Sequence, residues 1–188
     1  MKEHTCNCSF SEKTTEEVKI ECQFISCQEK IIMGDMVNHL KDFHKSYELR
    51  PKKHIGKLGS ASWFLPVDML QSKAVSWIPS IASCRGQTFV LQAHVHASDW
   101  VFWVTILGSE EEANKFEVKM SIPTKGSNKF YMGFREKVFS VDESVGEILK
   151  NRNNVLRLNK NLAHTIEDGR QSFQIDYQII CKKKVNSN

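Results

Sequence analysis

The stretch Cys22–His44, CQFISCQEKIIMGDMVNHLKDFH, decides how this chain of 188 residues is organised. Its cysteines and histidines follow the spacing Cys-x4-Cys-x11-His-x4-His, which makes Cys22, Cys27, His39 and His44 the candidate ligands. Two thiolates and two imidazoles can surround one tetrahedral Zn²⁺ ion. The spacing therefore predicts a small zinc finger with zinc as its cofactor.

A segment of this size needs the metal in order to fold. Phe24, Ile32 and Leu40 are expected to form a minimal apolar core among the ligands, and Gly34-Asp35 is typical of the start of a short helix that would carry both histidines. Zinc binding contributes roughly 10 to 16 kcal/mol in such peptides, far more than three apolar side chains supply. We expect zinc loss to unfold residues 20–46 while the rest of the chain stays folded. The alternative is that two free thiols and two surface histidines have this spacing by chance and bind no metal.

The composition is that of a soluble globular protein. Apolar residues make up 40% of the chain, which allows a sizeable core. The formal net charge of +4 is too small to indicate a strong nucleic-acid-binding surface. No apolar run approaches the roughly 18 to 20 residues of a membrane span, and residues 1–15 lack the apolar core of a secretory signal. We therefore expect a cytoplasmic protein, with the nucleus as a second location and no membrane partner.

The cysteines outside the finger are expected to be free. A finger needs reduced thiolates, so the compartment is expected to be reducing. Cys84 and Cys181 lie in apolar runs and are interpreted as small buried hydrophobes. Cys6 and Cys8 are either unpaired thiols or, with His4, the remnant of a second metal site.

From about residue 61 onward, short apolar runs separated by turn residues predict β-strands. The runs are Ala61–Leu70, Ala74–Ser83, Thr88–His96, Trp100–Leu107, Lys115–Ile122, Lys129–Arg135, Val155–Leu158 and Ser172–Cys181. In the last run, Ile175, Tyr177 and Ile179 alternate with Asp176 and Gln178. One face of that strand is expected to be buried and the other wet.

One helix is expected among these strands. Ser140–Glu143 has the form of a capping box and predicts a short helix that ends near Asn151, and a further helical turn is expected at 159–163. Many short strands with one inserted helix predict a mainly β fold, an antiparallel sandwich in place of a parallel α/β sheet. The expected parts are a flexible lead-in over residues 1–20, the finger over 21–46, the sandwich over 47–182 and a basic tail over 183–188. Residues 45–60 fit either a loose connection or a docked edge strand.

A series of short motifs follows the finger. They are His44-Lys45-Ser46, Phe64-Leu65, Ala74-Val75-Ser76-Trp77, Ser83-Cys84, Ile106-Leu107-Gly108, Glu112-Ala113-Asn114-Lys115-Phe116, Ser144–Ile148 and Ile175–Cys181. In this order, and with this finger spacing, the chain resembles the seven-in-absentia (SINA/SIAH) family from about Cys22 to Cys181.

The resemblance implies a substrate-binding domain with a TRAF-like sandwich fold, preceded by a SIAH-type zinc finger. Members of the family are RING-type ubiquitin-protein ligases that dimerise through this domain and hold degron peptides of targets or adaptors. In the family the peptide adds as a strand in a groove. The matching peptide-binding positions here are Glu48, Arg50, Val75 and Trp77. An exposed Trp77 beside a strand edge would anchor an apolar peptide residue, whereas a buried Trp77 would fill the core.

The chain also departs from the family. A RING holds two zinc ions with about eight Cys/His ligands, which this chain does not supply, and the first of the family's paired fingers is missing or degenerate. Pro79 lacks the N–H that backbone pairing to a peptide would use, and Glu48 and Arg50 make the groove more charged than in the family.

We therefore expect a substrate-recognition and dimerisation module without ligase chemistry of its own. Its expected partners are degron-containing proteins or adaptors, in a homodimer or in a heterodimer with a RING-bearing family member. A fragment of a full-length ligase remains an alternative.

Two other function classes compete with this one. A finger that reads nucleic acid is disfavoured, because its helix would open with Gly34-Asp35-Met36 and place a carboxylate near the phosphates. A cysteine hydrolase would need Cys84 to meet His94 or His96 in space, and no nucleophile turn surrounds Cys84.

Overall fold

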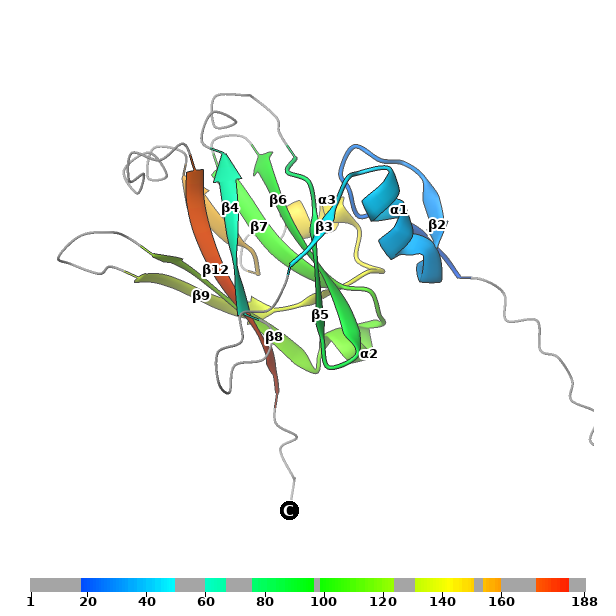
Figure 1. Cartoon of the computed structure of the whole chain (residues 1–188). Helices are drawn as coiled ribbons and strands as arrows, with labels where there is room; N and C mark the ends of the chain where they lie inside the picture. Colours follow the sequence, from blue (N-terminus) through cyan, green and yellow to red (C-terminus); the bar gives the residue numbers. More distant parts are fainter. Residues whose placement is uncertain are drawn as a thin grey trace, which may run out of the picture.

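Two β-sheets face each other in the computed structural model, and the finger packs beside one of them (Figure 1). The structure describes residues 18–49, 60–66, 76–96, 99–123, 131–150, 154–159 and 172–182. Most of the expected lead-in, the basic tail and most of the expected helical turn at 159–163 lie outside these residues. Within the described part of the chain, no helix is long and apolar enough to cross a membrane.

The smaller sheet of the sandwich has four antiparallel strands. They are β4 (Ser60–Pro66), β12 (Ser172–Cys181), β8 (Phe116–Pro123) and β9 (Tyr131–Lys137), in the order β4-β12-β8-β9. β12 is paired on both of its edges. The last strand of the chain therefore lies inside the sheet, where it closes the sandwich.

The larger sheet has six strands. They are β3 (Tyr47–Glu48), β5 (Ser80–Cys84), β6 (Gln87–His96), β7 (Asp99–Ile106), β10 (Phe139–Ser140) and β11 (Leu156–Asn159). Their order is β10-β7-β6-β5-β3, and β11 pairs with the same strand, β7, as β10 does. Two short pairs, β3 with β5 and β10 with β7, are parallel, which the antiparallel expectation did not include.

A tight turn joins β5 to β6. Arg85 has a φ of 53° and Gly86 a φ of 76°, and two successive positive values are typical of the hairpin turn that matches the twist of the flanking strands. Glycine adopts such angles without a steric penalty. The turn falls between the runs Ala74–Ser83 and Thr88–His96, which the sequence predicted as separate strands.

The main core lies between the two sheets. In β12, Ile175, Tyr177 and Ile179 are buried in it, while Asp176 and Gln178 are partly exposed. The predicted alternation of this strand is confirmed. Facing residues from β6, β7 and β8 complete the core.

The central strands β6 and β7 are buried on both faces. Val90 on the outer face of β6 packs with finger residues, and Val101 and Trp103 on the outer face of β7 pack with Ile148 and Leu149. This double cover explains why these two strands are near-continuous apolar runs without the alternation of β12.

Two short helices lie among the strands, where the sequence predicted one. α2 (Glu110–Ala113) was missed, although Ser109 and Glu112 cap it reciprocally. α3 (Val145–Lys150) is the predicted helix, but its start was placed wrongly. The Ser144 hydroxyl accepts from the Glu147 N–H at 3.3 Å, so the cap is at Ser144, while Ser140 belongs to β10.

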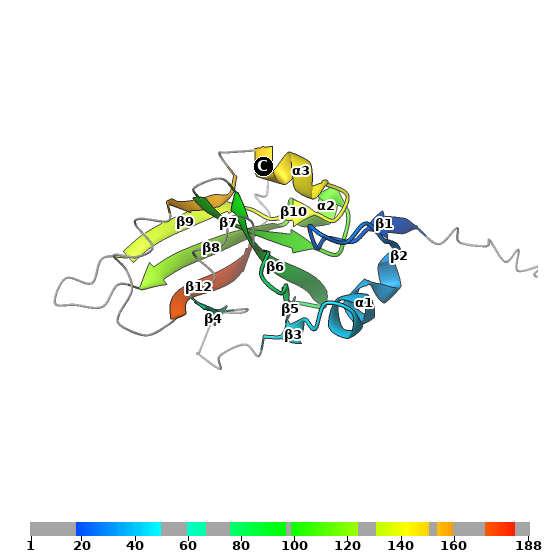
Figure 2. The same ribbon diagram turned by 90° about the horizontal axis from the view of Figure 1, so that it is seen from above.

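The finger consists of a hairpin and a helix. Its elements are β1 (Lys19–Glu21), β2 (Lys30–Ile32), a 3-10 turn (Met33–Asp35) and α1 (Met36–Asp42). The side chain of Asp35 makes no capping hydrogen bond, although the sequence suggested one. In Figure 2, α1 lies on the side of β3, and β1 lies on the side of β10 and α3.

The core of the finger is shared with the sandwich. Met36 and Leu40 of α1 are 0% exposed and belong to one cluster with Ile81, Val90 and Val141 of the larger sheet and the loop that follows it. Of the three apolar residues expected to form this core, Phe24 only packs at its edge. The expectation that the finger unfolds alone rested on an isolated core, which the structure does not have.

Residues 76–80 contain a bulge that explains Pro79. Ser76 bridges to His94 and Ser80 pairs with Leu91, so four steps along this segment match three steps along β6. The extra residue falls between Trp77 and Pro79. Proline is tolerated there because no ladder hydrogen bond is lost.

We expect the Leu40→Ala substitution to destabilise the sandwich as well as the finger. The side chain is fully buried in the shared cluster, so its loss should cost about 2 to 5 kcal/mol. All four tryptophans lie outside the finger, so denaturant unfolding followed by tryptophan fluorescence reports on the sandwich.

The matched control is Val18→Ala, which shortens a side chain that is 60% exposed and should change stability by less than about 0.5 kcal/mol. An unchanged tryptophan transition in Leu40→Ala would contradict a shared cooperative unit.

Candidate metal centre

Four separate pieces of the finger deliver the candidate ligands. Cys22 follows β1 directly, and Cys27 ends a turn that the Cys27 N–H closes on the Phe24 carbonyl at 2.8 Å. His39 lies in α1, and His44 lies just beyond its C-terminal cap, Phe43. The helix was predicted to carry both histidines, but it ends at Asp42 and so carries His39 alone.

The four ligand atoms converge on one point. All of them lie within 4.8 Å of one another. Nε2 of His39 is 3.1 Å from Nε2 of His44, while the Cys22 Sγ–His44 Nε2 and Cys27 Sγ–His39 Nε2 distances are 3.4 Å and 3.6 Å.

These separations fit a tetrahedral ion. Ordinary zinc–nitrogen and zinc–sulfur bond lengths place two nitrogens about 3.3 Å apart and a nitrogen and a sulfur about 3.6 Å apart. The four residues are therefore close enough, and correctly arranged, to bind one metal ion.

The surroundings hold the ligands in place. The Phe24 N–H points to the Cys22 sulfur at 3.5 Å, and the Phe24 ring packs on His44 with centroids 4.5 Å apart. On the other side, Phe43 stacks on His39 at 5.0 Å, and Oε2 of Glu29 lies 3.5 Å from Nδ1 of His39. A carboxylate behind a ligating imidazole fixes its tautomer. The sequence analysis missed this role of Glu29.

Without a metal, burial favours the neutral forms of Cys22 and His44. Burial raises the pKa of the Cys22 thiol to about 12, and the neighbouring Cys27 adds to this effect while the Phe24 N–H opposes it. Burial and the nearby His39 lower the pKa of His44. At neutral pH a metal ion therefore meets a neutral His44 and a protonated Cys22, whose proton it must displace.

The structure places the four predicted peptide-binding residues very differently. Glu48 lies exposed on edge strand β3, with its Oε1 2.5 Å from Nζ of Lys41. Arg50 and Val75 lie outside the described residues. The prediction of an exposed Trp77 is wrong, because its side chain is 5% exposed and its ring lies 4.9 Å from that of Trp100 in the core. The alternative, in which Trp77 fills the core, holds.

The structure does not support the hydrolase alternative. Cys84 pairs with Gln87 at one end of β6, whereas His94 is seven residues further along that strand, or about 23 Å. Cys84 is also 6% exposed, and burial raises the pKa of its thiol. Cys84 is therefore an unreactive core residue, as first interpreted.

The helix of the finger has one face against the sandwich and one face in solvent. Met36 and Leu40 are buried against the sandwich, Asn38 and Asp42 are exposed, and the Lys41 side chain is 38% exposed. The expectation that the finger does not read nucleic acid stays a prediction.

Comparison with known proteins adds little. No family model matches the chain, and no curated protein matches it. Among solved structures, the chain is similar to TRAF5 of Notothenia coriiceps, with a TM-score of 0.39 and 8% identity over 80% of this chain and 83% of that one. A similarity at this level supports no inference about function.

We expect the purified chain to hold about one zinc ion, and the Cys27→Ala variant to hold almost none, because three ligands no longer close the tetrahedron. Elemental analysis after dialysis against zinc-free buffer measures this. Cys84→Ala is the matched control and should keep its zinc, since Cys84 lies in the core of the sandwich. Equal zinc contents in the two variants would refute the site.

We expect the metal affinity to fall as the pH falls. The Cys22 thiol, with its pKa near 12 in the metal-free site, releases a proton on binding. Each released proton raises the apparent affinity about tenfold per pH unit. Competition with a coloured chelator between about pH 6.5 and about pH 8 measures the slope. An affinity that does not change across this range would contradict a thiolate ligand.

Proposed function

We propose that this chain is a zinc-containing peptide-recognition and dimerisation module of the ubiquitin-proteasome pathway, similar to the substrate-binding part of SINA/SIAH proteins. It binds degron-like segments of target proteins or adaptors and has no RING of its own. The observation that carries the proposal is the open outer edge of β3.

β3 is the terminal strand of the larger sheet in the described part of the chain. The Leu49 N–H donates to the Ile81 carbonyl at 2.7 Å, and the pairing is parallel. In a parallel ladder this register turns Tyr47 and Leu49 toward β5 and leaves the N–H and C=O of Glu48 on the outer side. A peptide strand can pair with these two groups.

Apolar side chains accompany this edge. Tyr47 of β3 is 45% exposed, and Ile78, just before β5, is 48% exposed. They supply the apolar contact that the sequence analysis assigned to Trp77. The Glu48 carboxylate is paired with Lys41, which holds the pKa of Glu48 below its usual range. The edge is therefore both apolar and charged.

The metal centre determines where β3 lies. Only Lys45 and Ser46 separate the ligand His44 from this strand, and Lys45 has a φ of 57°, a turn that few residues adopt. The Ser46 N–H donates to the Leu40 carbonyl at 3.0 Å, which ties the turn to α1. Zinc in the finger would thus hold both the start of the strand and Lys41, the partner of Glu48.

The module has no catalytic role in this proposal. It acts as a homodimer, or pairs with a RING-bearing SINA/SIAH protein that supplies the ligase activity, in the cytoplasm or the nucleus. A longer ligase of which this chain is one part would use the same peptide edge. Co-purification of the tagged full chain with a RING-bearing family member tests the heterodimer, and light scattering of the chain alone tests the homodimer.

We expect Glu48→Pro to abolish binding of peptides that pair with β3, because proline removes the outward N–H. The probe is a displayed library of random peptides of about ten residues, selected on the immobilised full chain. Glu48→Ala is the control, since it keeps the N–H and removes the carboxylate. Selected peptides should bind Glu48→Pro at least about tenfold more weakly than Glu48→Ala, which corresponds to a loss of about 1.4 kcal/mol in binding free energy. Failure to select any peptide with this pattern would refute the proposal.

A further inference from the structure

A groove lies on the side of the finger away from α1 and β3. Its volume is about 620 Å³, and it separates the first strand of the finger from the loop between β10 and α3. All three residues of β1 line one wall and no residue of β2 does, while Val141, Asp142 and Val145 line the opposite wall. The groove therefore lies along the edge of β1 that β2 does not occupy.

The edge of β1 that faces the groove has unpaired backbone groups. The Met33 N–H donates to the Val18 carbonyl and the Cys22 N–H donates to the Glu29 carbonyl. In an antiparallel pair these bonds alternate, so even-numbered residues of β1 face β2. The N–H and C=O groups of Lys19 and Glu21 consequently point to the other side, and in the described part of the chain no strand pairs with them.

A buried side chain on the groove also has an unused acceptor. Gln23 is 2% exposed and lines the groove, and its Nε2 donates across to the Val141 carbonyl at 3.0 Å. Its Oε1 has no hydrogen-bond partner among the described residues. Leaving a buried amide oxygen without a donor costs about 1 to 3 kcal/mol, so a ligand that supplies a donor gains this amount.

From this geometry we infer that the groove binds an extended peptide of a partner protein, which adds as a strand to β1 and donates a hydrogen bond to Gln23. The alternating N–H and C=O groups of Lys19 and Glu21 match a peptide backbone. Val145, which is partly exposed, offers an apolar contact for a peptide side chain. The charged lining residues are Glu21, Asp142 and Lys19, which sum to one negative charge and favour a peptide with a basic residue.

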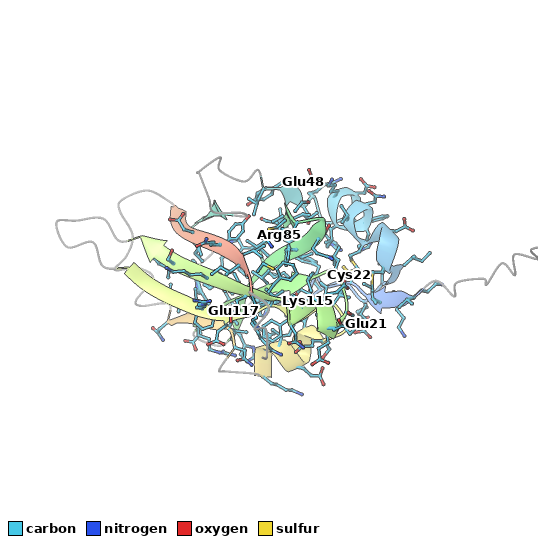
Figure 3. The ribbon with its side chains drawn as sticks, turned by 90° about the horizontal axis from the view of Figure 1, so that it is seen from below. Glu21, Cys22, Glu48, Arg85, Lys115 and Glu117 are labelled. Atoms are coloured by element: carbon cyan, nitrogen blue, oxygen red, sulfur yellow. The ribbon has the colours of Figure 1, made fainter. Side chains whose placement is uncertain are left out.

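This site is separate from the peptide edge proposed above. Figure 3 shows Glu48 and Glu21 on opposite sides of the finger, with Cys22 between them. Both metal ligands on the hairpin, Cys22 and Cys27, line the groove. A metal ion would therefore hold the groove in shape without contacting the peptide backbone at Lys19 and Glu21.

Two substitutions at one position test the inference. Glu21→Pro removes an N–H that points into the groove and breaks no hydrogen bond to β2, whereas Glu21→Ala keeps this N–H. The probe is a displayed library of random peptides of about ten residues, selected on the immobilised full chain at low salt. A class of selected peptides rich in Lys or Arg should bind Glu21→Pro at least about tenfold more weakly than Glu21→Ala. The zinc content of each variant confirms that its finger is folded.

The same peptides distinguish this site from the β3 edge. Peptides of the groove should bind Glu48→Pro as tightly as the unchanged chain, and peptides of β3 should bind Glu21→Pro equally well. Selection of peptides that depend on Glu48 alone supports the proposed function and overturns the groove. Selection of peptides that depend on Glu21 alone supports the groove and overturns the proposed function.

Amide hydrogen exchange provides a second readout that needs no variant. In the free chain the amides of Ile20 and Cys22 should be protected, while those of Lys19 and Glu21 should exchange fast, and a bound peptide should protect the latter pair. Protection of Lys19 and Glu21 without peptide would overturn the inference in favour of an occupant from the same chain. Protection of these two amides that grows with protein concentration would overturn the inference in favour of a second copy of the chain.

Discussion

The burial of Met36 and Leu40 against the larger sheet is the contact on which the rest of the molecule depends. It joins a metal centre that has few apolar residues of its own to a sandwich with a large core. In return, the finger covers Ile81 and Val90, which would otherwise leave the outer face of the sheet exposed. The finger has no complete core without the sandwich, so it is better described as one layer of the sandwich.

This arrangement also determines which strand edges stay open. β10 and β11 occupy the far edge of β7, and β5 occupies the inner edge of β3. Among the strand edges that stay unpaired in the described part of the chain, those at Glu48 and at Lys19–Glu21 both flank the finger. Edge strands are usually protected against pairing, and the two proposed peptide sites use these edges.

The sequence predicted those features that depend on local spacing or on alternation. The four candidate ligands were identified from their spacing along the chain, which does not depend on how the chain packs. Strand β12 was identified because its apolar and polar residues alternate, with one face toward solvent. Trp77 was misplaced because the sequence does not reveal that a bulge at Pro79 turns this segment into the core. The start of α3 was misplaced because Ser140 and Glu143 have the same capping pattern as Ser144 and Glu147, and only the parallel pairing of β10 with β7 distinguishes them. The groove beside β1 was not predictable, because Val141 is more than a hundred residues away from Gln23 along the chain.

The high pKa of the Cys22 thiol bears on how the finger survives oxidative stress. Peroxides and disulfides react with the thiolate form of cysteine, and a thiol that stays protonated reacts slowly. Before metal loading, Cys22 is thus poorly reactive toward oxidants, although Cys27 lies close enough to become its partner in a disulfide. In the metal-free site, Cys22 therefore stays mainly in its protonated thiol form at neutral pH.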